Sequence, residues 1–196
     1  LQGNRTHLGR FELVNVGEAA SLREKNGIKF MANEASTDAR DLLKRAIALH
    51  RDGDLTLSER LYLQVLEAEP EQTDALQLLG VIAAQMGNTT LAIERVNRSL
   101  AINPNQPGAL NNLGNMLVEE QRYEEAIDCY ERAIHFDATN AQAYFHLAHV
   151  YLSVDRHLDA VSSYTRSTEL EPDNASHWNA LGSALEKVGR LDDAVE

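Results

Sequence analysis

The sequence contains a repeat of 34 residues, and this period constrains the fold more than any other feature. Pro70 and Pro104 lie one period apart, and Pro172 lies two periods further on, with Ala138 in the slot between them. A fixed period of this length indicates a helical solenoid, in which each repeat packs mainly against its neighbours. We therefore expect an all-α fold, a right-handed superhelical solenoid of antiparallel helix pairs.

The columns of the repeat set its boundaries. Four full repeats cover residues 39–72, 73–106, 107–140 and 141–174, and a truncated fifth covers residues 175–196. Apolar and very small residues recur at helical offsets, which places them on one face of each helix. The small column of the first helices is Ala46, Gly80, Gly114, Ala148 and Gly182, and that of the second helices is Ser58, Ala92, Ala126, Ala160 and Ala194. Small residues in both helices let the two backbones approach closely.

Individual residues in these columns allow specific expectations. Gly114 and Ala126 are predicted to face each other across the third helix pair, so a larger side chain at residue 114 would force the helices apart. Trp178 stands in a column of bulky apolar residues and is expected to be largely buried. Arg45 replaces a leucine of the first helix, and we interpret it as part of a polar N-terminal cap.

The repeat resembles the tetratricopeptide repeat (TPR) family. The motifs that carry the resemblance are Leu110-x-x-Leu113-Gly114 with Ala126-x-x-x-Tyr130, and Ala160-x-x-x-Tyr164 with Pro172 and Trp178-x-x-Leu181-Gly182. The resemblance covers residues 39–196, and Arg45 and Ala138 depart from the pattern. It implies a protein–protein interaction scaffold that binds an extended peptide or partner segment in a concave groove.

Two alternatives to a plain scaffold remain open. The repeats also resemble those that precede bacterial transferase domains. The chain would then be the substrate-recognition region of a larger enzyme (a glycosyltransferase, sulfotransferase or methyltransferase) with its catalytic domain beyond Glu196. The second alternative is a self-assembly module. Because Glu196 falls within the second helix of the fifth repeat, we interpret the chain as a fragment of a longer protein.

In a solenoid of this family the first helices line the groove, and the middle of that surface is rich in side-chain amides. An amide group both donates and accepts hydrogen bonds, which suits contact with a peptide backbone. The predicted partner-binding residues are Gln77, Asn111, Asn112, Asn115, Phe145, His149 and Asn179. The alternative is that these are ordinary solvated helix positions. Since none is expected to support packing, replacing a groove asparagine by alanine is predicted to leave the fold intact.

The sequence contains no motif that indicates catalysis, a cofactor or a metal site. His146 and His149 have a spacing compatible with metal binding, but no third ligand stands at a suitable distance. We find no glycine-rich phosphate loop, nucleophile elbow or carboxylate pair set against a buried base. The Glu119-Glu120 doublet is interpreted as a solvated face. The chain as it stands is therefore predicted not to be an enzyme and to need no cofactor.

Composition narrows the class of partner and the compartment. The net charge of −12 argues against a nucleic-acid backbone as partner. The sequence has no apolar stretch of membrane-spanning length, so we expect no membrane partner. Cys129 is the only cysteine, which excludes an internal disulfide and suits a reducing compartment; we predict a cytoplasmic location. The sequence leaves the oligomeric state open.

Residues 1–38 stand outside the repeat pattern and are predicted to form a non-repeat arm. Met31 is a plausible natural start, in which case residues 1–30 are translated leader sequence. The alternative is a disordered arm that belongs to the protein.

Overall fold

The computed structural model describes residues 38–189, whose regular structure consists of helices. The first helix covers residues 38–51. The helices that follow are α2 (Leu55–Ala68), α3 (Thr73–Gln85), α4 (Thr89–Ile102), α5 (Pro107–Glu119), α6 (Tyr123–Phe136), α7 (Ala141–Ser153), α8 (His157–Leu170) and α9 (Ala175–Lys187). The predicted arm up to residue 37, with Met31, and residues 190–196 of the fifth repeat lie outside the described residues.

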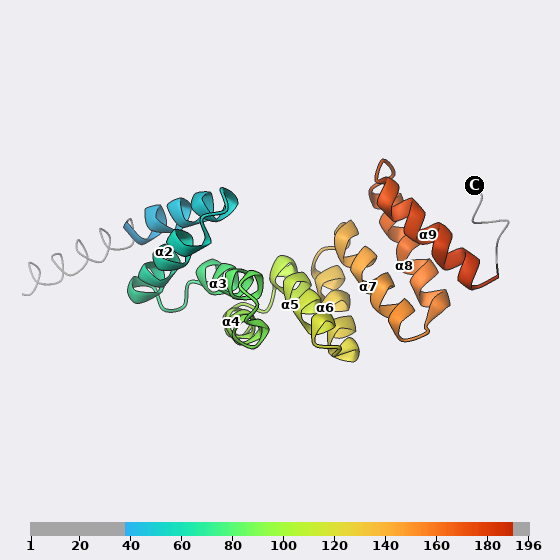
Figure 1. Ribbon diagram of the computed structural model, residues 1–196, viewed down its shortest axis with the longest axis horizontal. Helices are drawn as coiled ribbons and strands as arrows, with labels where there is room; N and C mark the ends of the chain where they lie inside the picture. The colour runs from blue at the N-terminus through green and yellow to red at the C-terminus, as the bar shows by residue number, and fades with distance from the viewer. Residues whose placement is uncertain (1–37, 190–196) are drawn as a thin grey trace, which may run out of the picture.

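Consecutive helices pack in antiparallel pairs, and the pairs follow one another in a row (Figure 1). Helix α3 pairs with α4, α5 with α6, and α7 with α8. Each pair also contacts the next, because α4 packs on α5, α6 on α7 and α8 on α9. The first helices of successive pairs also meet, α3 with α5 and α5 with α7. This arrangement confirms the predicted all-α solenoid of antiparallel helix pairs.

The first helices of successive repeats begin one period apart. Their starts are Thr73, Pro107, Ala141 and Ala175. Local chemistry explains these starts. The Asn140 side chain caps α7 by accepting a hydrogen bond from the Ala143 amide at 3.0 Å. Proline begins α5, where the amide hydrogen that it lacks would have no partner within the helix.

The turn inside each repeat places one residue in the left-handed region of backbone space. Three of these residues are glycines, Gly53, Gly87 and Gly189, with φ of 86°, 81° and 75°. The other two are Gln121 and Asp155, with φ of 58° and 59°. A residue with a Cβ pays a steric penalty there. The turn therefore keeps the same geometry in every repeat, even where Gln121 or Asp155 replaces the favoured glycine.

The small columns bring the paired helices into close contact. A Cβ added at Gly80 would lie 2.6 Å from Cγ2 of Val96, and one added at Gly114 would lie 2.6 Å from Cε1 and Cζ of Tyr130. The nearest neighbour of Gly114 across the pair is therefore the Tyr130 ring. Ala126, which was predicted to face Gly114, is fully buried one turn earlier on α6.

Arg45 and Trp178 lie near the two ends of the described solenoid, and both are exposed. Arg45 is exposed, as expected for a polar end repeat. Trp178 is 50% exposed, so the prediction that it is buried was wrong. The leucine of the same column, Leu110, fills its slot with no exposed surface, whereas the larger indole lies at the surface. Its Nε1 donates a hydrogen bond to the carbonyl of Pro172 at 2.8 Å, which holds the ring there.

Candidate binding groove

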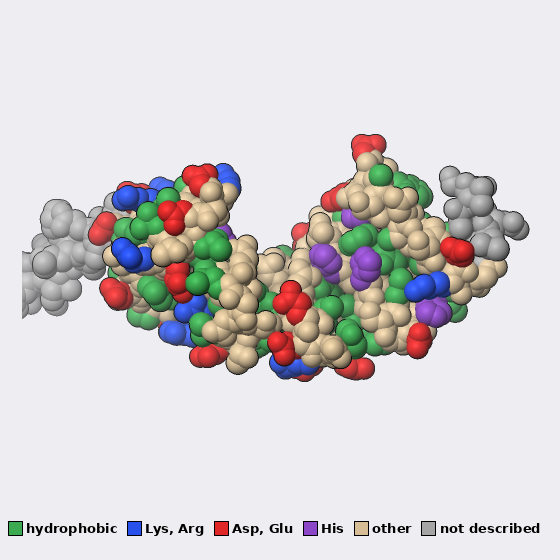
Figure 2. Space-filling model, viewed as in Figure 1, with side chains coloured by type: hydrophobic (Ala, Val, Ile, Leu, Met, Phe, Trp, Pro, Cys, Tyr) green, Lys and Arg blue, Asp and Glu red, His purple; other side chains and the backbone are tan. Residues whose placement is uncertain are grey.

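The row of helix pairs forms a crescent with a hollow between its two arms (Figure 2). Histidine side chains gather over α7 beside this hollow. A cavity of about 440 Å³ lies between α5 and α7. We call it the α5–α7 pocket; the residues that define it here are Asn115 and Glu119 of α5, Tyr130 of α6, and Phe145, His146 and His149 of α7.

Phe145 is the centre of an aromatic cluster at this pocket. Its ring stacks on that of His177, with centroids 4.6 Å apart and planes at 23°. The rings of His149 and Tyr164 meet it edge-on, with centroids at 4.8 Å and 5.6 Å. His146 lies on another side at 5.9 Å. Phe145 was predicted to be a groove residue, and the structure shows that it also packs between α7, α8 and α9.

His177 belongs to this cluster, although the sequence reasoning did not select it. Its side chain is buried, with 2% of its surface exposed. In three other repeats the same position holds a buried alanine: Ala75, Ala109 and Ala143. The sequence feature that could have identified His177 is a histidine at a repeat position that otherwise holds alanine. Because the extra ring must find room, it stacks on Phe145 across the boundary between repeats four and five.

Asn115 is tied to the core. Its Oδ1 accepts a hydrogen bond from the Tyr130 hydroxyl at 2.7 Å, and only 1% of the Tyr130 surface is exposed. Removing this amide would leave a buried hydroxyl without its partner. The prediction that groove asparagines support no packing is therefore wrong for Asn115. The equivalent hydroxyls of Tyr62 and Tyr164 have no hydrogen-bond partner within residues 38–189.

The remaining predicted residues lie away from the α5–α7 pocket. Asn111 and Asn112 are half-buried on α5, earlier in the helix. Gln77 is half-buried on α3, where its Nε2 would lie 3.8 Å from a Cβ added at Gly108. Asn179 is exposed on α9. Of the predicted set, the pocket brings together Asn115, Phe145 and His149.

The electrostatics of the pocket favour neutral histidines. Burial lowers the pKa of His146 below its ordinary value, and the nearby His149 and His177 lower it further. His149 is exposed as a residue, but partial burial of its ring beside Phe145 and Tyr164 also lowers its pKa. Both rings are therefore uncharged at neutral pH. Glu119 is then the charged side chain among the residues that line the pocket.

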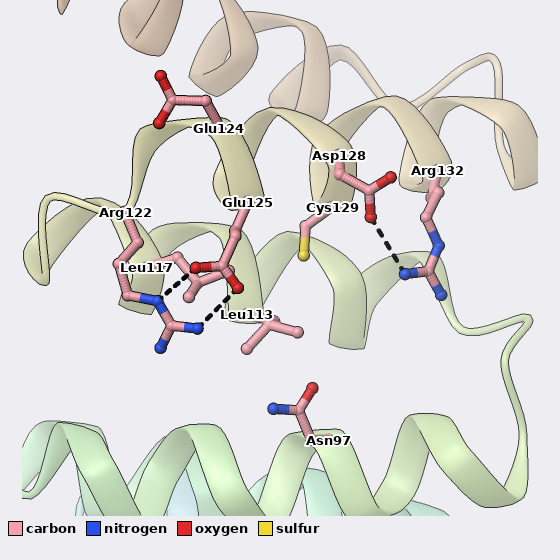
Figure 3. Close-up of a pocket in the computed structure, with 9 residues that line it drawn as sticks. All are labelled: Asn97, Leu113, Leu117, Arg122, Glu124, Glu125, Asp128, Cys129 and Arg132. Atoms are coloured by element: carbon pink, nitrogen blue, oxygen red, sulfur yellow. Dashed lines mark hydrogen bonds and ion pairs between the residues drawn. The ribbon is translucent and has the colours of Figure 1, made fainter.

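A second cavity, of about 350 Å³, lies between α4, α5 and α6 (Figure 3). Two of its three carboxylates are paired: Arg122 makes two contacts of 2.7 Å with Glu125, and Arg132 lies 3.3 Å from Asp128, whereas Glu124 forms no ion pair within residues 38–189. Burial raises the pKa of the Cys129 thiol to about 11, so the thiol stays protonated and is a poor nucleophile. This cavity offers no evident catalytic chemistry.

No group of three or more His, Cys, Asp or Glu side chains within residues 38–189 is placed to hold a metal ion. Among the helices described there, none combines the length and the apolar character that crossing a membrane requires.

Family models identify the class of protein to which the chain belongs. The model described as "Tetratricopeptide repeat" matches residues 43–108, 141–174 and 163–196, in three versions. A fourth model, described as "TPR repeat", matches residues 114–154. The chain is a tetratricopeptide repeat protein. Repeats of this kind typically serve as scaffolds for protein–protein interaction, and none of the matching models describes a catalytic domain.

Solved structures of repeat proteins share the fold. The crystal structure of MamA is 28% identical, with a TM-score of 0.70 over 76% of this chain and 88% of that one. MamA from Desulfovibrio magneticus RS-1 is 18% identical, with a TM-score of 0.72 over 80% and 89%. Pseudomonas aeruginosa PilF is 22% identical, with a TM-score of 0.75 over 83% and 73%. The last two show the fold alone. A search of the curated proteins finds no significant match.

Proposed function

We propose that the chain is a scaffold that holds an extended segment of a partner protein along its first helices. The observation that carries this proposal is the α5–α7 pocket, which combines aromatic surface with polar groups. Because Asn115 Oδ1 is occupied by the Tyr130 hydroxyl, its Nδ2 is the group left to donate, and it suits a peptide carbonyl. The exposed, neutral ring of His149 can donate and accept beside it.

The other predicted residues extend this surface. Asn111 and Asn112 lie earlier on α5. Gln77 on α3 and Asn179 on α9 occupy the same repeat position as Asn111. A segment that crosses successive first helices would pass these side chains in turn, with the Nδ2 of Asn111 as its available group because its Oδ1 is buried. An extended backbone offers repeated carbonyl and amide groups, so the same scaffold position can be used once in each repeat.

Charge and cysteine content support the class of partner and the compartment. With a net charge of −12, the chain would be repelled by nucleic-acid backbones, so we propose a protein partner. The single cysteine, Cys129, is buried and forms no disulfide, which supports a reducing compartment such as the cytoplasm.

The test is a peptide-display selection on the full chain, followed by affinity measurement with matched variants. His149→Ala and Asn112→Ala remove groups from the proposed surface. His135→Ala and Asn97→Ala remove the same groups from exposed places on the second helices α6 and α4. We expect each groove variant to weaken binding by about 0.5–1.5 kcal/mol, the net value of a hydrogen bond, while the controls bind as the wild type does.

The opposite pattern would refute the proposed surface. If His135→Ala or Asn97→Ala weakened binding while the groove variants did not, the partner would bind the second helices. Melting temperatures for all four variants separate lost contact from lost structure.

A further inference from the structure

We propose that the α5–α7 pocket holds an arginine side chain of the bound segment, with Glu119 pairing with the guanidinium group. This inference rests on the proposed function and specifies the chemistry of the ligand at one place on the surface. It also revises the interpretation of Glu119 as part of a solvated face.

The first argument is the uncompensated charge of Glu119. Within residues 38–189 its carboxylate forms no ion pair or hydrogen bond, whereas Glu125 and Asp128 of the second cavity are each paired with an arginine. A carboxylate at the rim of a pocket attracts a cationic ligand. A basic side chain could complete at this pocket the same kind of pair that the chain already makes within itself at the second cavity.

The second argument is the direction of the helices. Glu119 is the last residue of α5 and Ser153 is the last residue of α7, and both line the pocket. The pocket therefore lies at the carboxyl ends of two helices. The aligned peptide dipoles of a helix place partial negative charge at its carboxyl end, which favours a cation there.

The third argument selects arginine over lysine. The rings of Phe145, His146 and His149 line the pocket; Phe145 also stacks on His177, and His146 on Tyr130. A guanidinium group is planar and stacks on rings while it donates to a carboxylate, but an ammonium group is a compact point charge. The lowered pKa values of the two histidines keep these rings neutral at pH 7, so they do not repel the cation.

The experiment must separate a local pair from the general attraction of an acidic chain for basic peptides. Three acetylated and amidated pentapeptides serve as probes, each with four glycines around a central arginine, citrulline or lysine. Citrulline has nearly the shape of arginine but carries no charge. Affinity is measured on the full chain by nuclear magnetic resonance, from the shifts of the His146 and His149 ring protons.

The variants are Glu119→Gln and its neighbour Glu120→Gln, which makes the same change of net charge outside the pocket. We expect the arginine peptide to bind about 3- to 5-fold more tightly than the citrulline peptide, the scale of an exposed ion pair. Glu119→Gln should abolish this preference, and Glu120→Gln should keep it. The lysine peptide should bind more weakly than the arginine peptide.

Several results would overturn the inference. These are equal affinity for arginine and citrulline, equal affinity for arginine and lysine, or equal effects of the two glutamine variants. A chain that binds display-selected peptides through His149 and Asn112 but does not distinguish arginine from citrulline would keep the proposed function and lose this inference. Peptide binding that only the second-helix controls disturb would remove the proposed function itself.

Discussion

Gly114→Ala tests the packing of the third helix pair with the smallest possible change. The added Cβ would lie 2.6 Å from two ring atoms of Tyr130, closer than carbon atoms can approach. The ring has little room to move, because it is buried and its hydroxyl is bonded to Asn115 at 2.7 Å. Either the ring shifts and strains this bond, or α5 and α6 separate.

The magnitude follows from opposing contributions. Alanine stabilises a helix interior by about 1 kcal/mol relative to glycine. Overpacking costs roughly 1–3 kcal/mol, and a weakened buried hydrogen bond costs up to about 1.5 kcal/mol more. These contributions sum to a net loss of up to about 3.5 kcal/mol. Each kcal/mol lost lowers the melting temperature by about 2–4 °C in a chain of this size.

Gly108→Ala is the matched control on the same helix. A Cβ there meets only Gln77 Nε2, at 3.8 Å, so the substitution is expected to be neutral or slightly stabilising. Thermal unfolding followed by circular dichroism measures both variants. If Gly114→Ala melted at or above the temperature of Gly108→Ala, the close approach of α5 to the Tyr130 ring would be refuted.

Three further predictions concern the turn, the hydroxyl pair and the histidines. Gln121→Gly should stabilise the chain by about 0.5–1 kcal/mol by relieving the positive φ of 58°, and a lower denaturation midpoint would contradict this. Asn115→Ala should cost about 1–3 kcal/mol and Asn112→Ala much less, while adding Tyr130→Phe to Asn115→Ala should recover most of the loss; an unrecovered double variant would contradict the pairing. The lowered pKa values of His146 and His149, which face Glu119, Tyr130, Tyr164 and His177, mean that protonation favours the unfolded state. Stability from this source is complete above the unfolded pKa of about 6.5 and is lost as the pH falls through the folded pKa. Unfolding at pH 7.5 and pH 5 should show the loss, and replacing both histidines by glutamine should reduce it.

The backbone was predictable from the sequence because every repeat solves the same geometric problem. A glycine at residues 53, 87 and 189 identifies the left-handed turn, and the period then places Gln121 and Asp155 in that conformation although neither residue favours it. The buried small columns follow for the same reason. Agreement among five repeats compensates for the weakness of any single residue's preference.

The side chains were less predictable where a repeat departs from its column. The repeat pattern predicts where each Cα lies, but it does not predict whether a larger side chain can be buried there. Trp178 is half-exposed where Leu110 is fully buried, and His177 occupies a place that elsewhere holds alanine and stacks there on Phe145. Both outcomes depend on neighbours in the adjacent repeat, which no single column contains.

One repeat position shows how these departures build the candidate site. The residues at that position are Ile47, Val81, Asn115 and His149, and each stands 15 residues before a place on the second helix that holds Tyr62, Val96, Tyr130 and Tyr164 in turn. In the first repeat, Ile47 packs against a cluster that contains Tyr62, so the surface there is apolar. In the third, Asn115 binds the Tyr130 hydroxyl and keeps a donor for a ligand. In the fourth, His149 meets the Tyr164 ring edge-on at 5.5 Å. The backbone is the same each time, so the solenoid changes from an apolar to a polar and aromatic surface by substitution at one position. The 34-residue period therefore predicts where a candidate binding site can lie, and the residues that differ between repeats at this position give the site its chemistry.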